Sequence, residues 1–379
     1  MVKKVFLSMQ VNEVMKDIEE LGIITIVDSL SVTSMPVNEF VLYRLKKGYK
    51  CKQGLIVYGE PKSGDVKIPK EIRCIFVGNS IFRMKNAILE LLKFTGNNTI
   101  FHVHQPKSAR LFYFSAINMG ILNKTLFTVH STYSMRSTLY KIESWVSVLF
   151  PKKVTCVSET SYLEFSKIMK FIKSDNILPI RNGVDVENIR KIAAKFPANR
   201  NIKSLVCVAR MIPLKNHKFL IKLLKELPDF DLKLIGKEDD NNEIRKYAKE
   251  MGVINRVSFL GLLEREKVYK EMNDCGIYVS ASLAEGMPIS VLEAMSLGLI
   301  PILSPIGPHI EIAKECANVY VEELDLATWK NTILEITNKS DYYNMSNEII
   351  NQVKMQFSLD NMHTNYFKLY KEMIGDKNA

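Results

Sequence analysis

The 379-residue sequence lacks several features that would place it in a class at once. No run of 18 or more apolar residues occurs, so no membrane-spanning helix is predicted. The start "MVKKVFLSMQVNEVMKD" is basic, but only a short apolar stretch follows before acidic residues, so no secretory signal is predicted. The six cysteines form neither a C-x-x-C pair nor a cluster with histidine. We therefore expect buried, reduced thiols in a cytosolic protein.

Motifs for the common nucleotide-binding classes are also missing. No G-x-G-x-x-G follows a strand pattern and no P-loop occurs, so neither a dehydrogenase nor a P-loop NTPase is favoured. Basic stripes interleaved with aromatic residues are absent, and no nucleic-acid partner is expected.

The net charge of +11 is unevenly distributed along the chain. Residues 1–185 contain 26 Lys and Arg residues against 15 Asp and Glu residues, a net charge of +11, and the remainder is neutral. This asymmetry predicts that the N-terminal half meets an anionic partner. The candidates from charge alone are an anionic membrane surface, a phosphorylated substrate and nucleic acid, of which nucleic acid is disfavoured by the missing basic and aromatic stripes. The alternative is a solvated lysine surface without a partner.

Short apolar runs alternate with helical patterns through most of the chain. A first series of strands is expected at 23–30, 54–59, 72–78, 99–105, 126–130, 153–158 and 176–183, and a second at 204–210, 230–236, 256–261, 276–282, 299–304 and 318–323. Patterns such as "VNEFVLYRLKKG" and "MKNAILELLKFTG" lie between them, apolar at i, i+3 and i+4 and closed by glycine. The alternation predicts α/β architecture with parallel sheets covered on both faces.

Two consecutive series predict two doubly wound domains. The first is expected to span residues 1–185 and the second residues 186–357. A final helix at about 358–379 is expected to pack back onto the first domain.

Glu285 is placed where ligands bind in such sheets. "GIYVSAS" predicts a strand, "LAEGM" its exit loop, and Pro288 the first helical residue. Ligands bind beyond the carboxyl ends of the strands in open α/β sheets. The amide N–H groups of Gly286 and Met287, with the positive helix end, predict an anion site suited to phosphate. Glu285 itself can accept hydrogen bonds from hydroxyl groups, and a plain helix cap is the alternative.

A second carboxylate, Glu293, follows in the same helical pattern. It lies five residues after Pro288, roughly 7–8 Å along the axis at about 1.5 Å per residue. It can face the same crevice and accept from a pair of vicinal hydroxyl groups, such as those of a ribose. A solvated helix face is the alternative, and its apolar neighbours Leu292, Ala294 and Met295 argue against it.

Two cations lie on an earlier strand exit. In "LVCVARMIPLKNHKFLIKLL", Arg210 ends a strand and Lys215 precedes a helix. Two cations on one loop can clamp a diphosphate and stabilise it as it departs. Two unrelated surface cations are the alternative. Asn216 or His217 is expected to cap the helix.

Histidines mark strand ends in the first half. "LFTVHSTY" places His130 at a strand exit, and "FHVHQP" places His102 and His104 on one face of a strand. With no third ligand near that pair, a metal site is not favoured, and His102 is expected to be buried with its hydrogen bonds satisfied. "IRNGVD" places a turn at Asn182 and Gly183 near the domain boundary.

Together these segments resemble the retaining glycosyltransferases of family four, which have the GT-B fold of two Rossmann-like domains facing a central crevice. "SASLAEGMPISVLEAMSLGLIPI" resembles the family's segment of two glutamates with seven residues between them. "VARMIPLKNHKFLI" resembles its phosphate loop of arginine and lysine. "LIPILS", "LIG", "RNGVD" and "TVHST" fall in the family's order and spacing. The resemblance covers nearly the whole chain and is strongest from about residue 180 to residue 310.

The resemblance implies a role for each of these residues. Arg210 and Lys215 bind the donor diphosphate, and Glu293 holds the nucleotide ribose. Glu285 contacts hydroxyl groups of the transferred sugar, which His130 approaches from the opposite domain. Members of the family transfer sugar with retention of configuration and without a metal or other cofactor. The resemblance implies that the leaving diphosphate helps to deprotonate the acceptor, so no enzymatic nucleophile is expected.

One segment departs from the family pattern. The family usually has a Gly-Gly loop after its first strand, whereas "VDSLSVTSMPVNEF" places Ser31, Thr33 and Ser34 there. Glycine allows a close backbone approach that these residues do not, so donor contacts from this loop are in doubt. The 22 residues before Ile23 are expected to add a strand and a helix at the sheet edge.

The hypothesis is a retaining, metal-independent glycosyltransferase. It moves a sugar from a nucleotide-diphosphate donor, with UDP-sugar favoured, to a glycan acceptor on a lipid diphosphate in bacterial surface polysaccharide synthesis. We expect it in the cytoplasm, held peripherally at the anionic inner face of the cell membrane by its basic first half. The rivals are a sugar phosphorylase or nucleotide-sugar epimerase on the same fold, and a non-catalytic glycan- or lipid-binding protein.

Overall fold

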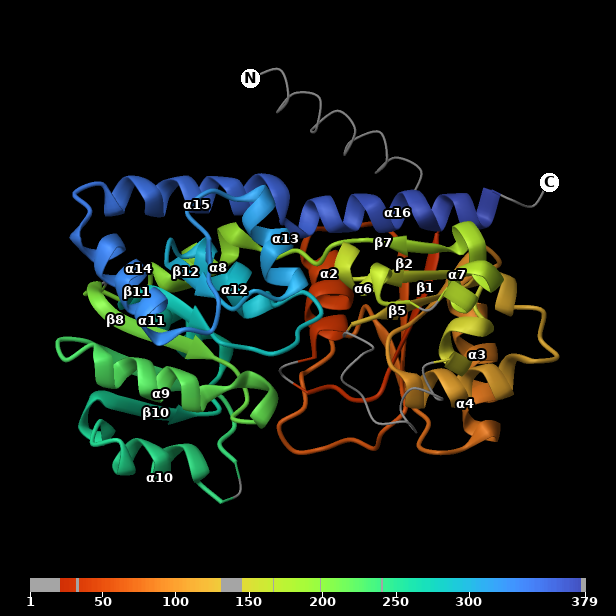
Figure 1. Cartoon of the computed structure of the whole chain (residues 1–379). Coiled ribbons are helices and arrows are strands. Elements are labelled where there is room, and N and C mark those ends of the chain that lie inside the picture. The colour runs from red at the N-terminus through yellow and green to blue at the C-terminus, as the bar shows by residue number, and fades with distance from the viewer. Residues whose placement is uncertain are drawn as a thin grey trace. The chain divides into compact units, whose positions relative to one another are not determined.

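The computed structural model describes residues 21–375 except residues 32–33, 131–144, 166, 198 and 240, and it contains two compact units (Figure 1). The N-terminal unit runs to Arg181 and includes the final helix from Asp360 onward, and the C-terminal unit is Asn182–Leu359. The strand and helix predicted before Ile23, and Thr33 of the first-strand loop, lie outside the described residues.

The N-terminal unit is built on a seven-stranded parallel sheet with the order β3-β2-β1-β4-β5-β6-β7. The strands are β1 (Gly22–Val27), β2 (Lys52–Val57), β3 (Arg73–Phe76), β4 (Thr99–Val103), β5 (Thr125–Val129), β6 (Lys153–Cys156) and β7 (Ile177–Pro179). Each overlaps a strand expected from the sequence. The helices are α2 (Tyr43–Lys46), α3 (Ile81–Thr95), α4 (Pro106–Ala116), α6 (Glu159–Leu163), α7 (Lys167–Lys173) and α16 (Leu359–Gly375).

Strand β1 shows why both faces of this sheet are covered. Its sequence "GIITIV" is apolar almost throughout, and all six residues are buried. Ile24 and Ile26 join a core cluster that includes residues of α3 and α4. Val27 joins a second cluster with Val37 and Val41, which lie on the opposite side. Because side chains alternate along a strand, a continuous apolar run needs helices on both faces.

The predicted helix "VNEFVLYRLKKG" is the main local difference from the expectation. It forms a π-helix over Pro36–Leu42 that runs into the short helix α2 rather than one regular α-helix. The turn ends at Gly48, whose φ of 71° lies in the left-handed region that favours glycine. The helix "MKNAILELLKFTG" is regular, with the Ser80 side chain accepting from the Arg83 N–H and Gly96 (φ 86°) closing it.

The final helix, α16, packs against the sheet of the N-terminal unit. Tyr43 donates to Asp360 at 2.8 Å, and the Lys153 ammonium lies 2.9 Å from the Glu372 carboxylate. Between these ends the Tyr370 hydroxyl lies 2.7 Å from a ring nitrogen of His102, which is on β4. The helix is therefore anchored to this unit along its length, although it follows the C-terminal unit in the chain.

The C-terminal unit has six parallel strands in the order β10-β9-β8-β11-β12-β13. They are β8 (Asn201–Val208), β9 (Asp231–Ile235), β10 (Val257–Gly261), β11 (Cys275–Ser280), β12 (Ile300–Leu303) and β13 (Tyr320–Val321). The helices are α8 (Val186–Ala193), α9 (His217–Glu226), α10 (Glu243–Glu250), α11 (Arg265–Asn273), α12 (Ile289–Ser296), α13 (Gly307–Glu315), α14 (Leu326–Asn338) and α15 (Tyr342–Gln356). The prediction of two doubly wound α/β domains is confirmed.

Three further observations bear on the sequence-based expectations. All six cysteines are free, and five of them are buried. The "LIG" motif ends at Gly236, where a Cβ would stand 2.1 Å from the Ala209 carbonyl oxygen, so only glycine fits between the ends of β8 and β9. No helix among the described residues combines the length and the apolarity needed to cross a bilayer.

Candidate functional site

The strand order of the C-terminal unit brings two loops together. Strands β8 and β11 are neighbours in the middle of the sheet, and the chain proceeds from them toward opposite edges. A doubly wound sheet binds ligands at this reversal of strand order, beyond the carboxyl ends of the two strands. The loop after β8 carries Arg210 and Lys215, and the loop after β11 carries Glu285. The loops are also joined directly, since the Leu283 N–H donates to the Leu214 carbonyl at 2.9 Å.

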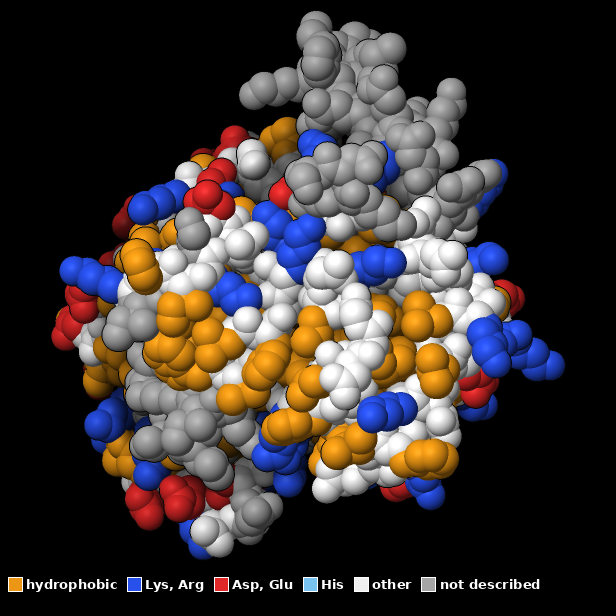
Figure 2. Space-filling view, turned by 90° about the vertical axis from the view of Figure 1, so that its right-hand side faces the viewer, with side chains coloured by type: hydrophobic (Ala, Val, Ile, Leu, Met, Phe, Trp, Pro, Cys, Tyr) orange, Lys and Arg blue, Asp and Glu red, His pale blue; other side chains and the backbone are white. Residues whose placement is uncertain are grey.

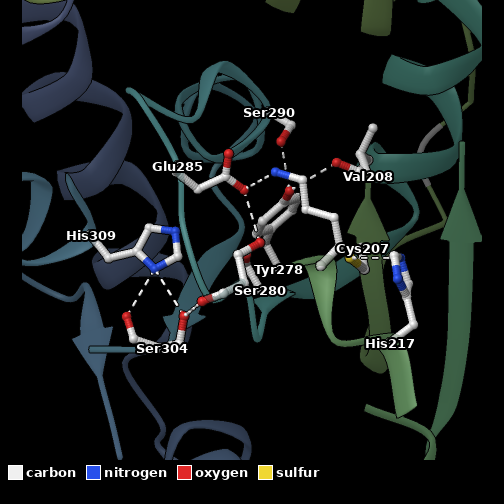
Figure 3. A network of polar contacts seen from close by, with 11 residues as sticks. Cys207, Val208, His217, Tyr278, Ser280, Glu285, Ser290, Ser304 and His309 are labelled. Carbon is white, nitrogen blue, oxygen red and sulfur yellow. Dashed lines mark hydrogen bonds and ion pairs between the residues drawn. The ribbon is translucent and has the colours of Figure 1, made fainter. Parts of the chain in front are cut away.

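Lys215 and Glu285 form an ion pair across these loops (Figure 3). Only 15% of the Lys215 side chain and 17% of the Glu285 side chain are exposed. The Ser282 hydroxyl donates to the same carboxylate oxygen, Oε1, at 2.8 Å. Glu285 Oε2 has no partner among the described residues and points away from both donors (Figure 3). The site therefore combines a held carboxylate, one open acceptor oxygen and an ammonium group.

A chain of buried hydroxyl groups supports this carboxylate. Ser282 lies 3.1 Å from Ser280, and the Ser304 hydroxyl donates to the Ser282 carbonyl. His309 is fully buried, and its Nδ1 lies 2.9 Å from the Ser304 carbonyl, so Nδ1 carries the proton. Burial lowers the pKa of His309 to about 4, and burial also lowers the pKa of His217 to about 4. Both imidazoles are therefore neutral near pH 7.

The segment after Glu285 is closely packed. Gly286, Met287 and Pro288 are all buried. The helix begins at Ile289, one residue later than predicted, because Pro288 has an extended conformation with ψ of 99° and precedes the first turn. Phosphate binding by the amide N–H groups of this turn stays a prediction.

Glu293 is held by the neighbouring helix α11. Arg265 donates to Glu293 Oε1 from Nε at 3.0 Å and from Nη2 at 2.6 Å, and the Tyr269 hydroxyl donates to the same oxygen at 2.8 Å. The carboxylate side chain is 9% exposed, so the expectation that it is not on a solvated helix face is confirmed. Oε2 has no hydrogen-bond partner among the described residues.

Arg265 and Tyr269 were missed by the sequence reasoning. Their signal was available, because Arg265 opens the helix after β10 and so stands at the same sheet edge as the other site residues. Tyr269 lies one helical turn later and therefore on the same face. What the sequence did not contain was the packing of α11 beside α12.

Arg210 and Asn216 complete the loop after β8. Arg210 is exposed, and its guanidinium forms no ion pair or hydrogen bond with another described residue. Asn216 occupies the N-cap position of α9 with φ of 51°, as expected. Its side chain, however, makes no capping hydrogen bond. The two cations therefore differ: Lys215 is paired with Glu285, whereas the Arg210 guanidinium is exposed and has no partner among the described residues.

His130 belongs to the N-terminal unit, at the exit of β5. Its Nε2 lies 2.9 Å from Nδ1 of His104, which follows β4, so the two neighbouring strand ends bring these rings together. The expectation for His102 is confirmed, since it is fully buried and both ring nitrogens have partners, Tyr370 at 2.7 Å and Thr128 at 2.6 Å. The described residues contain no group of three or more His, Cys, Asp or Glu side chains arranged to hold a metal.

Comparison with known proteins gives this geometry a context. Residues 188–355 match the family model of glycosyl transferases group 1. The chain is 28% identical over 190 residues to a GDP-mannose:cellobiosyl-diphosphopolyprenol alpha-mannosyltransferase of Xanthomonas oryzae, over 49% of each chain, so it spans about half the length of that relative. It is 25% identical over 301 residues to an Escherichia coli UDP-Gal:alpha-D-GlcNAc-diphosphoundecaprenol alpha-1,3-galactosyltransferase, covering 73% of this chain and 76% of that one.

The overall likeness to solved structures extends further than the sequence matches. The sucrose-phosphate synthase of Thermosynechococcus elongatus superposes with a TM-score of 0.76 at 14% identity, over 94% of this chain and 100% of that one. This likeness shows the GT-B fold. The group 1 segment contains both cations, both glutamates and the α11 residues Arg265 and Tyr269, whereas His130 lies outside it.

Proposed function

We propose that the protein is a retaining glycosyltransferase that moves a sugar from a nucleotide-diphosphate donor to a glycan carried on a lipid diphosphate. The observation that carries this proposal is the Lys215–Glu285 pair at the reversal of strand order inside the group 1 segment. It places a cation for phosphate and an acceptor for hydroxyl groups side by side, which is what a sugar attached to a diphosphate requires.

Arg210 and Lys215 supply positive charge for the diphosphate. They are the only Lys or Arg residues in the loops 209–216 and 281–288, and the neighbouring His217 and His309 are neutral. When the bond to the sugar breaks, negative charge develops on the diphosphate, and fixed cations stabilise it without reorganisation. The Lys215 ammonium has three N–H groups, so it can donate to the diphosphate with one of them while another keeps the contact with Glu285.

The two glutamates recognise the remaining parts of the donor. Glu285 accepts hydroxyl groups of the sugar at Oε2 while Ser282 and Lys215 fix Oε1. Glu293 accepts ribose hydroxyl groups at Oε2 while Arg265 and Tyr269 fix Oε1. Each carboxylate thus has one oxygen that orients the group and one that binds.

The relatives support the choice of donor, acceptor and stereochemistry. Both are named for acceptors on a diphosphate-linked polyprenol, which supports a lipid-linked glycan acceptor and a place in surface polysaccharide synthesis. One is named for GDP-mannose and the other for UDP-Gal. We favour a UDP-sugar, because the second relative covers the larger share of this chain. Both names give α-linked products, and sugars in UDP-galactose and GDP-mannose are themselves α-linked, which supports retention.

His130 is assigned to the reacting sugar from the N-terminal unit. Its Nε2 is engaged by His104, so the hydrogen bond between the two rings orients the imidazole. Replacement of His130 by alanine is expected to lower kcat more than it raises KM for the donor, because an orienting contact at the reacting sugar acts in the transition state.

The test is hydrolysis of nucleotide sugars in the absence of acceptor. A panel of UDP- and GDP-sugars is incubated with the enzyme, and nucleoside diphosphate release is measured. One donor is expected to be hydrolysed slowly, and Lys215→Ala and Glu285→Ala are each expected to lower the rate at least about tenfold. Lys218→Ala is the matched control, since this lysine pairs with Glu243 on the surface of α9 and α10. The anomeric configuration of the product on a lipid-linked acceptor, read by NMR, tests retention.

Three outcomes would contradict the proposal. Turnover that needs inorganic phosphate and no nucleotide would identify a phosphorylase. Interconversion of a nucleotide sugar without acceptor would identify an epimerase. Ligand binding with no turnover of any donor, with or without acceptor, would identify a non-catalytic binding protein.

A further inference from the structure

The exposed side of α3 carries large apolar side chains between lysines. Phe82, Lys85, Leu89 and Lys93 are all exposed and follow one another at spacings of three and four residues, so they form one stripe of the helix. Phe82 is 73% exposed. An outward stripe on a surface helix is normally polar throughout. This stripe instead alternates apolar and basic side chains.

Helix α4 repeats the arrangement. Lys107, Arg110, Phe114 and Ile117 are exposed and follow one another at spacings of three and four residues, with Ile117 directly after the end of the helix. The helices α3 and α4 are neighbours, and the Ser115 hydroxyl on α4 reaches the carbonyl of Ile81 at the start of α3. The two stripes therefore belong to one surface of the N-terminal unit.

Two further elements extend this surface. Phe171 on α7 is 87% exposed and Leu163 on α6 is 69% exposed. These helices are tied to α4 through the segment at 145–151, because the Tyr113 ring of α4 stacks on Phe150 at 5.5 Å and Lys173 of α7 donates to the Pro151 carbonyl at 2.6 Å. We call the surface that carries Phe82, Leu89, Phe114, Ile117, Leu163 and Phe171 the outer face.

Positive charge accompanies these apolar side chains. Figure 2 shows the side of the molecule on which α3, α4 and α7 lie, with orange side chains over its middle and blue ones among them. Residues 81–175 contain 13 Lys and Arg residues against 5 Asp and Glu residues, so they carry +8 of the net charge of +11. Lys85, Lys93, Lys107 and Lys167 are exposed and form no ion pair with another residue that the structure describes.

We infer that the outer face docks on an anionic lipid bilayer. Apolar side chains that protrude singly between basic ones suit the interface of a bilayer, where the rings enter the acyl region while lysines stay at the anionic headgroups. A second copy of the chain is a poor occupant, because two faces of like charge repel each other. This inference rests in part on the proposed function, since an acceptor on a lipid diphosphate is held at a membrane.

The experiment is sedimentation of the full chain with lipid vesicles, without donor or acceptor. Vesicles of phosphatidylcholine mixed with phosphatidylglycerol are compared with vesicles of phosphatidylcholine alone. We expect binding to the anionic vesicles only, weakened by added salt because charges at a surface are screened. Phe82→Ser with Phe171→Ser is expected to lower the vesicle partition coefficient roughly a hundredfold, since each of the two rings contributes about a factor of ten when its apolar area leaves water.

The controls separate the outer face from exposed apolar residues in general. Leu262 and Met355 are 64% and 61% exposed in the C-terminal unit, and Leu262→Ser with Met355→Ser is expected to leave vesicle binding unchanged. Lys85→Glu with Lys93→Glu is expected to lower binding without lowering the midpoint of thermal unfolding, because both lysines are exposed. Equal binding of the wild type to both vesicle types, binding that persists unchanged in high salt, or equal loss in both serine pairs would overturn the inference.

Two more measurements keep this inference separate from the proposed function. Light scattering in the absence of lipid measures whether the chain forms dimers. A dimer that is dissociated by the double substitution Phe82→Ser and Phe171→Ser would overturn the inference of membrane docking. Donor hydrolysis without vesicles is expected to be the same in the wild type and in this serine variant. A chain that binds anionic vesicles but hydrolyses no nucleotide sugar would refute the proposed function and leave the docking face intact, and the reverse result would refute the docking face alone.

Discussion

Replacing Lys215 by alanine, Glu285 by alanine, and both together separates the structural role of this ion pair from its role in turnover. Each single change leaves one charge largely shielded from solvent, because the two side chains are 15% and 17% exposed. Removing one partner of a fully buried pair costs about 3–5 kcal/mol. Here the carboxylate keeps the hydrogen bond from Ser282 and some solvent, so we expect about 2–3 kcal/mol for Lys215→Ala.

This loss of stability has a measurable size. A unit of roughly 150–250 residues loses about 2–4 °C of Tm for each kcal/mol, so Lys215→Ala should lower the unfolding midpoint of the C-terminal unit by about 4–12 °C. The double variant buries neither charge and should be more stable than either single variant. Circular dichroism during heating, with and without nucleoside diphosphate, reads the midpoint.

Unlike stability, turnover is not expected to recover in the double variant. A hydrogen bond to a charged group contributes about 1.5–3 kcal/mol, which corresponds to a factor of roughly 10–150 in kcat/KM for each residue. The double variant should be at least as slow as the slower single variant, because both donor contacts are lost. Turnover is measured as nucleoside diphosphate release with an acceptor present, below the unfolding temperature of every variant. Recovery of activity together with stability in the double variant would show that the pair is only structural, and normal activity in both single variants would refute the donor site.

Three other changes test separate parts of the site and the fold. Arg210→Ala is expected to raise the donor KM at least about tenfold with no change in Tm, since the guanidinium is exposed and has no partner among the described residues, and an unchanged KM in steady-state kinetics would remove Arg210 from the site. Arg265→Ala is expected to raise the donor KM less than Glu293→Gln does, because Arg265 only orients the carboxylate, and calorimetric titration with nucleoside diphosphates that differ at the ribose hydroxyls checks this order. Burial lowers the pKa of His363 to about 3 in the folded chain, below its unfolded value near 6.5, so stability is full above about pH 6.5 and falls as the pH drops. His363→Gln should remove about 1.4 kcal/mol per pH unit of this slope between about pH 6 and pH 4 in urea unfolding, and an unchanged slope would show that another group binds the proton.

The strands and helices could be predicted because their signals are local. The run "GIITIV" predicts a strand buried on both faces, and Gly96 marks the end of α3 by its left-handed conformation. The π-helix over Pro36–Leu42 could not be predicted in the same way. Its apolar spacing also fits a regular α-helix, so short-range spacing does not separate the two, and Val37 and Val41 of this segment pack in one cluster with Val27 and Leu55.

The candidate site also combines features that follow from short-range spacing with features that depend on tertiary packing. Arg210 and Lys215 share one loop, so their joint use for a diphosphate follows from spacing alone. Arg265 could be placed at the sheet edge, but its contact with Glu293 could not be predicted, since that contact depends on α11 and α12 lying side by side.

The amino-acid sequence by itself determined the alternation of strands and helices, the order of the motifs and the concentration of positive charge in the first half, because each depends on residue type and short-range spacing. The tertiary structure decided which of these residues meet. Lys215 reaches Glu285 only because β8 and β11 pair in the middle of a parallel sheet, a long-range contact that no local pattern specifies. The same holds for the outer face, where helices and short segments far apart in the chain place their exposed apolar side chains on one surface.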